Sequence, residues 1–181
     1  MTCGIFYPYV KEIFKNSNAK ILSLSPNLHL FPDELAENLK KTLKSIEGKF
    51  SKILVVYGRC APNIDLICES YKAKRIEGEH CGEIIGGWIF YKALREEPGT
   101  YFLYPFLSEN FKKFFVDELN HKVVKNLFKN YRRIIYFDFG DEAKRKTARE
   151  ISNYLNLSLE IVKMSEKDVE KRLNLLIQNI L

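Results

Sequence analysis

Short apolar runs rich in β-branched and aromatic residues alternate along the chain with longer segments of helical periodicity. This alternation is typical of an α/β fold, in which helices flank a largely parallel sheet. We therefore expect one Rossmann-like, three-layer α/β domain over residues 1–181. The clearest expected strands are Ile21–Leu24, Ile53–Tyr57, Tyr101–Tyr104, Arg133–Asp138 and Leu159–Lys163, and the clearest helices begin near Asp33, Asn63, Cys81, Glu109, Asp141 and Glu166.

The two ends of the chain illustrate how local signals define the elements. The segment 32–46 opens with Pro, Asp and Glu and carries leucines on one stripe, which predicts a helix with a core-facing side. Residues 1–15 predict a very short strand that ends at Cys3, followed by a helix from about Phe6 with Pro8 in its first turn. A strand over residues 3–7 is the alternative. The last third predicts one right-handed βαβα unit.

Composition excludes several classes of protein. No apolar run approaches the roughly 20 residues that span a bilayer, and the start of the chain lacks a secretory signal. We therefore expect a soluble, cytoplasmic protein without membrane contact. The formal net charge of +6 is a thin excess spread over both halves of the chain, which favours a solvated surface over a nucleic-acid partner.

Four cysteines and three histidines are few enough to consider one by one. Cys60 follows an expected strand and precedes an expected helix, which places it at the carboxyl edge of a parallel sheet, where open α/β sheets bind ligands. Cys3 precedes a helical pattern, and Cys81 begins one after the short expected strand Ala73–Ile76. A helix start favours a thiolate at Cys81. Three cysteines thus share one expected location.

Two histidines lie near the same edge. His29 lies between an expected strand and helix, and His80 is adjacent to Cys81. Thiolates with an imidazole suit tetrahedral zinc, and three thiolates suit an iron–sulfur cluster or a zinc ion with an open position. The spacings include no CxxC pair, so buried cysteines without a ligand are the alternative. Cys68 fits an apolar helix face and is expected in the core, and a solvated or capping role is expected for His121.

Aromatic residues and glycines follow Cys81. Gly86 and Gly87 lie in the middle of an expected helix over residues 81–94, where they are unfavourable unless another backbone or a flat cofactor approaches closely; packing of the helix on the sheet is the simpler explanation. Trp88 and Tyr101 then line either a pocket for a planar ligand or part of the core.

Carboxylates near these positions have two interpretations each. Asp138 ends an expected strand and faces the ligand edge, whereas Asp141 is expected to cap the next helix. Glu79 and Glu83 flank the His80–Cys81 pair and are candidates to orient an imidazole or to act as a base near a metal. No P-loop, GxGxxG or Ser/His/Asp arrangement is present.

Several short motifs occur in a characteristic order: Cys3-Gly4, Leu28-His29, Tyr57-Gly58-Arg59-Cys60, His80-Cys81 and Pro98-Gly99-Thr100-Tyr101-Phe102. In this order the chain resembles the domain-of-unknown-function family 1638 of methanogenic archaea and anaerobic bacteria, over roughly residues 3–175. Ala61 stands where that family usually has glycine. The resemblance implies an α/β domain with the three cysteines as the functional core, and a setting near corrinoid-dependent methyl transfer.

Three hypotheses about function follow. The first is a metal centre, zinc or iron–sulfur, on Cys3, Cys60 and Cys81 with His29 or His80, which serves anaerobic one-carbon or corrinoid-linked methyl metabolism. The second is a non-catalytic module that binds a corrinoid or another tetrapyrrole, or a corrinoid protein, through the aromatic residues. The third is a thiol redox protein. Sequence alone does not predict whether the protein is an enzyme.

Overall fold

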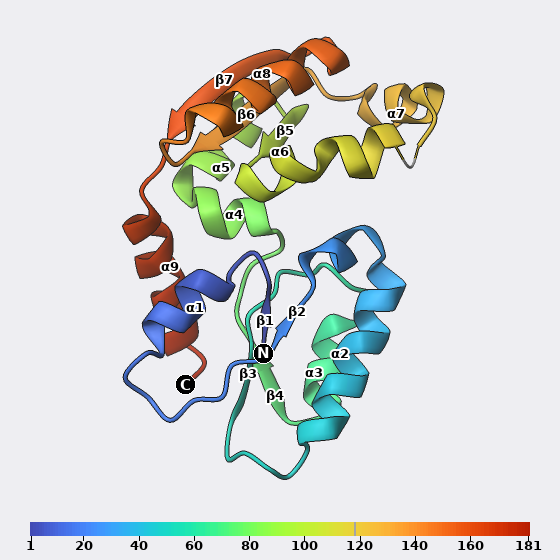
Figure 1. Ribbon diagram of the computed structural model, residues 1–181. Coiled ribbons are helices and arrows are strands. Elements are labelled where there is room, and N and C mark those ends of the chain that lie inside the picture. The colour runs from blue at the N-terminus through green and yellow to red at the C-terminus, as the bar shows by residue number, and fades with distance from the viewer. Residues whose placement is uncertain (118) are drawn as a thin grey trace. The chain divides into compact units, whose positions relative to one another are not determined.

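The computed structural model describes residues 1–117 and 119–181, apart from the side chains of His29 and Leu30. The chain divides into two compact units, which we describe separately: unit 1 comprises residues 1–84 and 169–181, and unit 2 comprises residues 85–168. Within the described residues, all paired strands are parallel and helices flank them (Figure 1), which confirms the α/β prediction. The single domain over residues 1–181 stays a prediction.

Unit 1 contains two pairs of short parallel strands. The strands are β1 (Thr2–Cys3), β2 (Ser23–Leu24), β3 (Ile53–Val55) and β4 (Ala73–Arg75), with β1 paired to β2 and β3 paired to β4. A parallel bridge between Thr2 and Val56 joins β1 to the end of β3. The strands therefore follow the order β2-β1-β3-β4, and the N-terminal strand that the sequence predicts is present at the centre.

Helices cover both faces of this sheet. They are α1 (Tyr7–Ile13), α2 (Pro32–Ile46), α3 (Ile64–Ser70) and α9 (Glu166–Gln178, which begins in unit 2), with a 3-10 helix, η1, at Pro26–Leu30. Figure 1 shows α2 beside α3 and α1 beside α9, on opposite sides of the strands. Unit 1 is thus the three-layer arrangement that the alternation predicts.

Helix α2 has the bounds predicted from its sequence. Asp33 and Glu34 lie in its first turn, where carboxylates interact favourably with the helix dipole. Leu35, Leu39 and Leu43 are at most 1% exposed and form its core-facing stripe.

Among the described helices, none is long and apolar enough to cross a membrane.

Unit 2 is built on one three-stranded parallel sheet in the order β5-β6-β7, with β5 at Thr100–Leu103, β6 at Arg133–Asp138 and β7 at Ser158–Lys163. The last five residues of β6 are buried, which explains why this strand reads clearly from sequence. The accompanying helices are α4 (Cys81–Gly86, which begins in unit 1), α5 (Trp88–Glu96), α6 (Pro105–Phe111), the π-helix η2 (Lys112–Asp117), α7 (His121–Phe128) and α8 (Glu142–Leu155).

Helix α8 is capped at both ends. The Asp141 side chain accepts hydrogen bonds from the backbone N–H groups of Ala143 and Lys144 at 3.0 and 3.2 Å, which confirms the predicted cap. Asn156 ends the helix in the left-handed conformation, with φ of 55°.

Two helix predictions in unit 2 are wrong. The single helix expected over residues 81–94 is broken at Gly87, whose φ of 56° and ψ of −129° only glycine adopts readily. The helix expected to begin at Glu109 begins earlier, at Pro105, and passes into the π-helix η2 after Phe111. In both places the sequence keeps an apolar stripe at helical spacing, but the backbone departs from α-helical geometry.

Candidate functional site

The carboxyl ends of the unit 1 strands meet at one edge of the sheet. Cys3 is the last residue of β1, Cys60 follows β3, and Cys81 begins α4 after β4. The chain leaves β1 for β2 on one side and leaves β3 for β4 on the other, so β1 and β3 form a topological switch point. Open α/β sheets bind ligands in the crevice at such a point.

Strand pairing positions Cys3 beside Tyr57. The bridge partners are Thr2 and Val56, and the Cys3 backbone N–H donates to the Val56 carbonyl at 3.2 Å. Because β1 and β3 are parallel, the next residue on each strand, Cys3 and Tyr57, share one face of the sheet. Both side chains are buried, at 4% and 2% exposure.

A close backbone contact brings the Cys60 loop to the start of α4. The Gly58 position leaves no room for a side chain, because a Cβ atom there would lie 2.7 Å from the Glu79 carbonyl oxygen. The Arg59 backbone N–H donates to that same oxygen at 2.9 Å. The loop after β3 therefore packs against the residues that precede Cys81, and glycine permits this approach.

The Cys81 thiol interacts with both other thiols. Hydrogen bonds of the Cys81 thiol with Cys3 and with Cys60, together with burial, raise the pKa of Cys81 well above its ordinary value. This differs from the expectation that the helix start favours a thiolate at Cys81: α4 has only six residues, and the thiol is 2% exposed. Cys60 is half-buried and is the more accessible member of the cluster.

A tyrosine hydroxyl completes this group, which we call the thiol cluster: Cys3, Cys60, Cys81 and Tyr57. The Tyr57 hydroxyl is buried, and no described residue meets the distance and angle criteria of a hydrogen bond to it. The Cys3 thiol nevertheless lies close enough to interact with it. Burial, then negative charge on any of the three thiols, raises the pKa of Tyr57 above its ordinary value. The sequence placed Tyr57 at the end of a strand and in the Tyr57-Gly58-Arg59-Cys60 motif, but gave it no role in the site.

The described residues contain no set of three or more His, Cys, Asp or Glu side chains arranged around a metal-ion position. Instead, the Cys81 thiol hydrogen-bonds to Cys3 and to Cys60, and these bonds with burial raise its pKa. Cys, with its soft sulfur, is nevertheless a preferred zinc ligand. The types of side chain in the cluster therefore fit a metal, and ligation requires that the thiols lose their protons and that the sulfur atoms turn toward a common centre.

Of the two predicted histidine ligands, the structure describes the side chain of His80 alone. His80 is exposed, beside Cys81, and its carbonyl accepts the Ile84 backbone N–H at 3.2 Å. His29 belongs to η1 after β2, but its side chain lies outside the described residues.

Both carboxylates next to the cluster accept hydrogen bonds at the loop that precedes Cys81. Glu79 accepts a hydrogen bond from Arg59 at 2.7 Å, and Glu83 accepts one from the Glu79 backbone N–H at 2.7 Å. In these contacts both carboxylates stabilise the loop that leads into Cys81.

Arg75, which the sequence did not single out, ties the ends of β3 and β4 together. Its side chain is 8% exposed and donates to the carbonyls of Tyr57, Ile76 and Gly78 at 2.9, 2.7 and 3.0 Å. Its Nε donates to Asp65 at 2.6 Å. The hydrogen bond from Arg75, supported by Arg59, lowers the pKa of Asp65.

The remaining predicted site residues lie in unit 2. A Cβ atom at Gly86 would lie 2.5 Å from the Phe137 ring, so packing of helix on sheet accounts for this glycine. Trp88 is 69% exposed, with the Lys92 ammonium 5.8 Å from its ring centre. Tyr101 packs edge-on against Phe128, with ring centres 5.0 Å apart.

Asp138 ends β6 as predicted and is 2% exposed. It accepts a hydrogen bond from the Gly140 backbone N–H at 2.9 Å and lies 3.5 Å from the Arg145 Nε. These contacts give Asp138 a role in the turn between β6 and α8.

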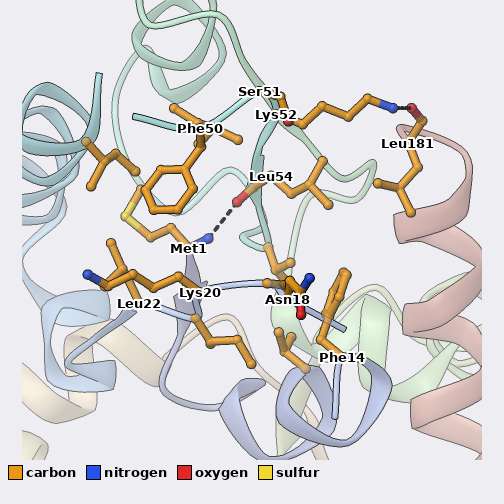
Figure 2. Close-up of a pocket in the computed structure, with 16 residues that line it drawn as sticks. Met1, Phe14, Asn18, Lys20, Leu22, Phe50, Ser51, Lys52, Leu54 and Leu181 are labelled. Atoms are coloured by element: carbon orange, nitrogen blue, oxygen red, sulfur yellow. Dashed lines mark hydrogen bonds between the residues drawn. The ribbon is translucent and has the colours of Figure 1, made fainter. Parts of the chain in front are cut away.

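A cavity of about 260 Å³ lies elsewhere in unit 1, near the start of β3 (Figure 2). Its lining is mostly apolar, with Lys20 and Lys52 as its cationic side chains. Figure 2 shows the Met1 amino group, which donates to the Leu54 carbonyl at 2.6 Å, and Lys52, which donates to Leu181 at 2.7 Å. None of the residues singled out from the sequence lines this cavity.

Comparison with known proteins supports the resemblance inferred from the motifs. A family model described as a protein of unknown function, DUF1638, matches residues 23–173. The matched span contains Cys60 and Cys81, and Cys3 precedes it. No curated protein and no solved structure matches the chain significantly.

Proposed function

The chain belongs to the DUF1638 family of proteins of unknown function, and from its own residues we propose that it holds a metal ion on the thiolates of Cys3, Cys60 and Cys81. The observation that carries the proposal is the contact of Cys81 with both other thiols. Three cysteines far apart in sequence meet at the switch point of a parallel sheet, where this class of fold binds its ligands.

The closeness of the thiols favours a single zinc ion over an iron–sulfur cluster. Sulfur atoms on one tetrahedral zinc lie about 3.8 Å apart, because each Zn–S bond is about 2.3 Å. Thiols that already hydrogen-bond to one another need only small shifts to reach that separation. In a [4Fe–4S] cluster each cysteine binds a different iron, so the thiolates lie farther apart.

The three cysteines differ in burial, which suits them to different roles in the proposed site. Cys3 and Cys81 are buried and are suited to hold the ion, whereas half-buried Cys60 lies toward the accessible side. His29 and His80 are the candidates for a fourth ligand, and without either one the fourth position is open to a small molecule. When bound, zinc supplies Lewis acidity that lowers the pKa of a bound thiol, the chemistry required for methyl transfer to sulfur in one-carbon metabolism.

Metal analysis of anaerobically purified protein tests the proposal. We expect about one zinc per chain in the wild type and most of it lost in Cys60→Ser and Cys81→Ser. Cys68→Ser is the control matched to Cys81→Ser, because Cys68 is as buried as Cys81 but lies on α3 in the core. Failure of the wild type to retain zinc or iron after equilibration with either ion would overturn the proposal, as would equal loss in Cys68→Ser.

A second candidate function rests on the same contact. Hydrogen-bonded thiols such as Cys60 and Cys81 are placed to exchange with a low-molecular-weight disulfide, which forms one protein disulfide and releases two small thiols. Incubation of metal-free protein with oxidised glutathione, followed by peptide mapping, tests this function. A reversible Cys60–Cys81 disulfide in a wild type that binds no metal would favour the redox function over the metal centre.

A further inference from the structure

Tyr57 presents a buried hydroxyl that the packing of unit 1 does not satisfy. The side chain is 2% exposed, and its oxygen has no hydrogen bond of full geometry within residues 1–117 and 119–181. Buried polar groups in folded proteins almost always have a partner, so one without a partner requires an explanation, such as an ion or a catalytic role. Phenylalanine would fill the same volume without leaving an unpaired hydroxyl.

The Tyr57 hydroxyl lies close to one residue of the neighbouring strand β1, Cys3. Cys3 and Tyr57 follow the bridged pair of Thr2 and Val56 on adjacent parallel strands, so their side chains leave the same face of the sheet. Cys3 is also the thiol with which the Tyr57 hydroxyl interacts as a hydrogen-bonding group. A neutral thiol is a weak acceptor, whereas a thiolate is a strong one.

We propose that Tyr57 is a positioning residue of the thiol cluster, whose hydroxyl donates a hydrogen bond to the Cys3 sulfur when that sulfur is a metal-bound thiolate. The inference rests on the proposed metal site and adds to it a residue that is not a ligand. Outer-shell donors of this kind orient the metal ligands and adjust their electron donation. The hydroxyl thereby gains the strong acceptor that it lacks while Cys3 is a neutral thiol.

The test compares two variants that each remove one buried hydroxyl. Tyr57→Phe removes the proposed donor, and Tyr136→Phe is the matched control. Tyr136 is 0% exposed, and its hydroxyl also has no partner among the described residues that meets the distance and angle criteria of a hydrogen bond. Zinc affinity is measured by competition with a chromophoric chelator. Substitution with cobalt(II) adds a sulfur-to-metal charge-transfer band that reports on the thiolates.

We expect Tyr57→Phe to bind zinc about 10-fold more weakly than the wild type. We also expect its charge-transfer band at longer wavelength, because a thiolate without a hydrogen bond gives up an electron more easily. Tyr136→Phe should match the wild type in both measurements. Unchanged affinity and band position in Tyr57→Phe would overturn the inference and leave the metal site standing, whereas a wild type that binds no metal would overturn both.

A measurement on the wild type covers the case in which Tyr57→Phe does not fold. In protein loaded with cadmium-113, the hydroxyl proton of Tyr57 should exchange slowly and show scalar coupling to the metal through the Cys3 sulfur. Rapid exchange of that proton, or a slowly exchanging proton with no coupling to cadmium, would contradict the proposed hydrogen bond.

Discussion

Replacement of Gly58 by alanine should separate the Cys60 loop from the start of α4. The new Cβ atom would lie 2.7 Å from the Glu79 carbonyl oxygen, 3.0 Å from the Glu79 carbonyl carbon and 3.2 Å from the His80 backbone nitrogen. All three are backbone atoms, so relief of the clash requires one of the two segments to move. Movement of the loop also breaks the hydrogen bond from the Arg59 N–H to Glu79, which is 2.9 Å long.

The magnitude follows from these two effects. Overpacking costs about 1 to 3 kcal/mol, and loss of a backbone hydrogen bond about 1 kcal/mol, so we expect the free energy of unfolding to fall by about 2 to 4 kcal/mol. Urea unfolding followed by circular dichroism measures this change. Zinc retention should fall in the same variant, because Cys60 moves away from Cys81.

Gly48→Ala provides the comparison. Gly48 has a φ of +71° and nothing within 4 Å of the added Cβ atom, so its substitution introduces backbone strain without a clash. We expect a loss of about 1 kcal/mol and no change in zinc retention. A Gly58→Ala variant that is no less stable than Gly48→Ala and that retains zinc would refute the reasoning.

Three further predictions concern unit 1 and the break between α4 and α5. Asp65→Asn should lower the free energy of unfolding near pH 7 by about 1 to 3 kcal/mol, because buried Arg75 loses its carboxylate partner. Since Arg75 lowers the pKa of Asp65, the stabilisation is fully present above the unfolded-state pKa and is lost as the pH falls through the folded-state pKa. The difference in the free energy of unfolding between the two proteins, measured in urea, should therefore shrink from pH 7 to pH 3, and a difference that stays constant or grows would contradict this role. In metal-free protein iodoacetamide should modify half-buried Cys60 well before Cys68, because burial raises the pKa of Cys68 to about 11, and peptide mapping that finds Cys68 modified first would contradict this order. Gly87→Ala should lower stability by about 1 to 3 kcal/mol in urea unfolding because of its positive φ, and an unchanged midpoint would count against this role.

The fold was predictable where apolar pattern and helix signals agree. In α2, Pro32 at the start and three buried leucines identify the helix and its orientation together. The break at Gly87 was not predictable from the pattern, because Gly86 fits closely against Phe137 in the helix whereas Gly87 leaves it, and the two glycines look alike in sequence.

The candidate site was predictable only in part. The strand-to-helix positions of Cys3, Cys60 and Cys81 predict a common edge, because parallel strands end together. Tyr57 was missed because its role depends on the register between β1 and β3, which no local pattern reveals. Arg75 was missed because its partners are mainly backbone carbonyls at the ends of two strands that are adjacent only in the fold.

The central claim is that Cys3, Cys60 and Cys81 act together as ligands of one metal ion. Zinc K-edge X-ray absorption of the zinc-loaded wild-type protein tests it most directly, because the extended fine structure counts sulfur neighbours around the ion. We expect three sulfur atoms at about 2.3 Å and one lighter ligand at about 2.0 Å. A first coordination shell of nitrogen and oxygen alone would contradict it.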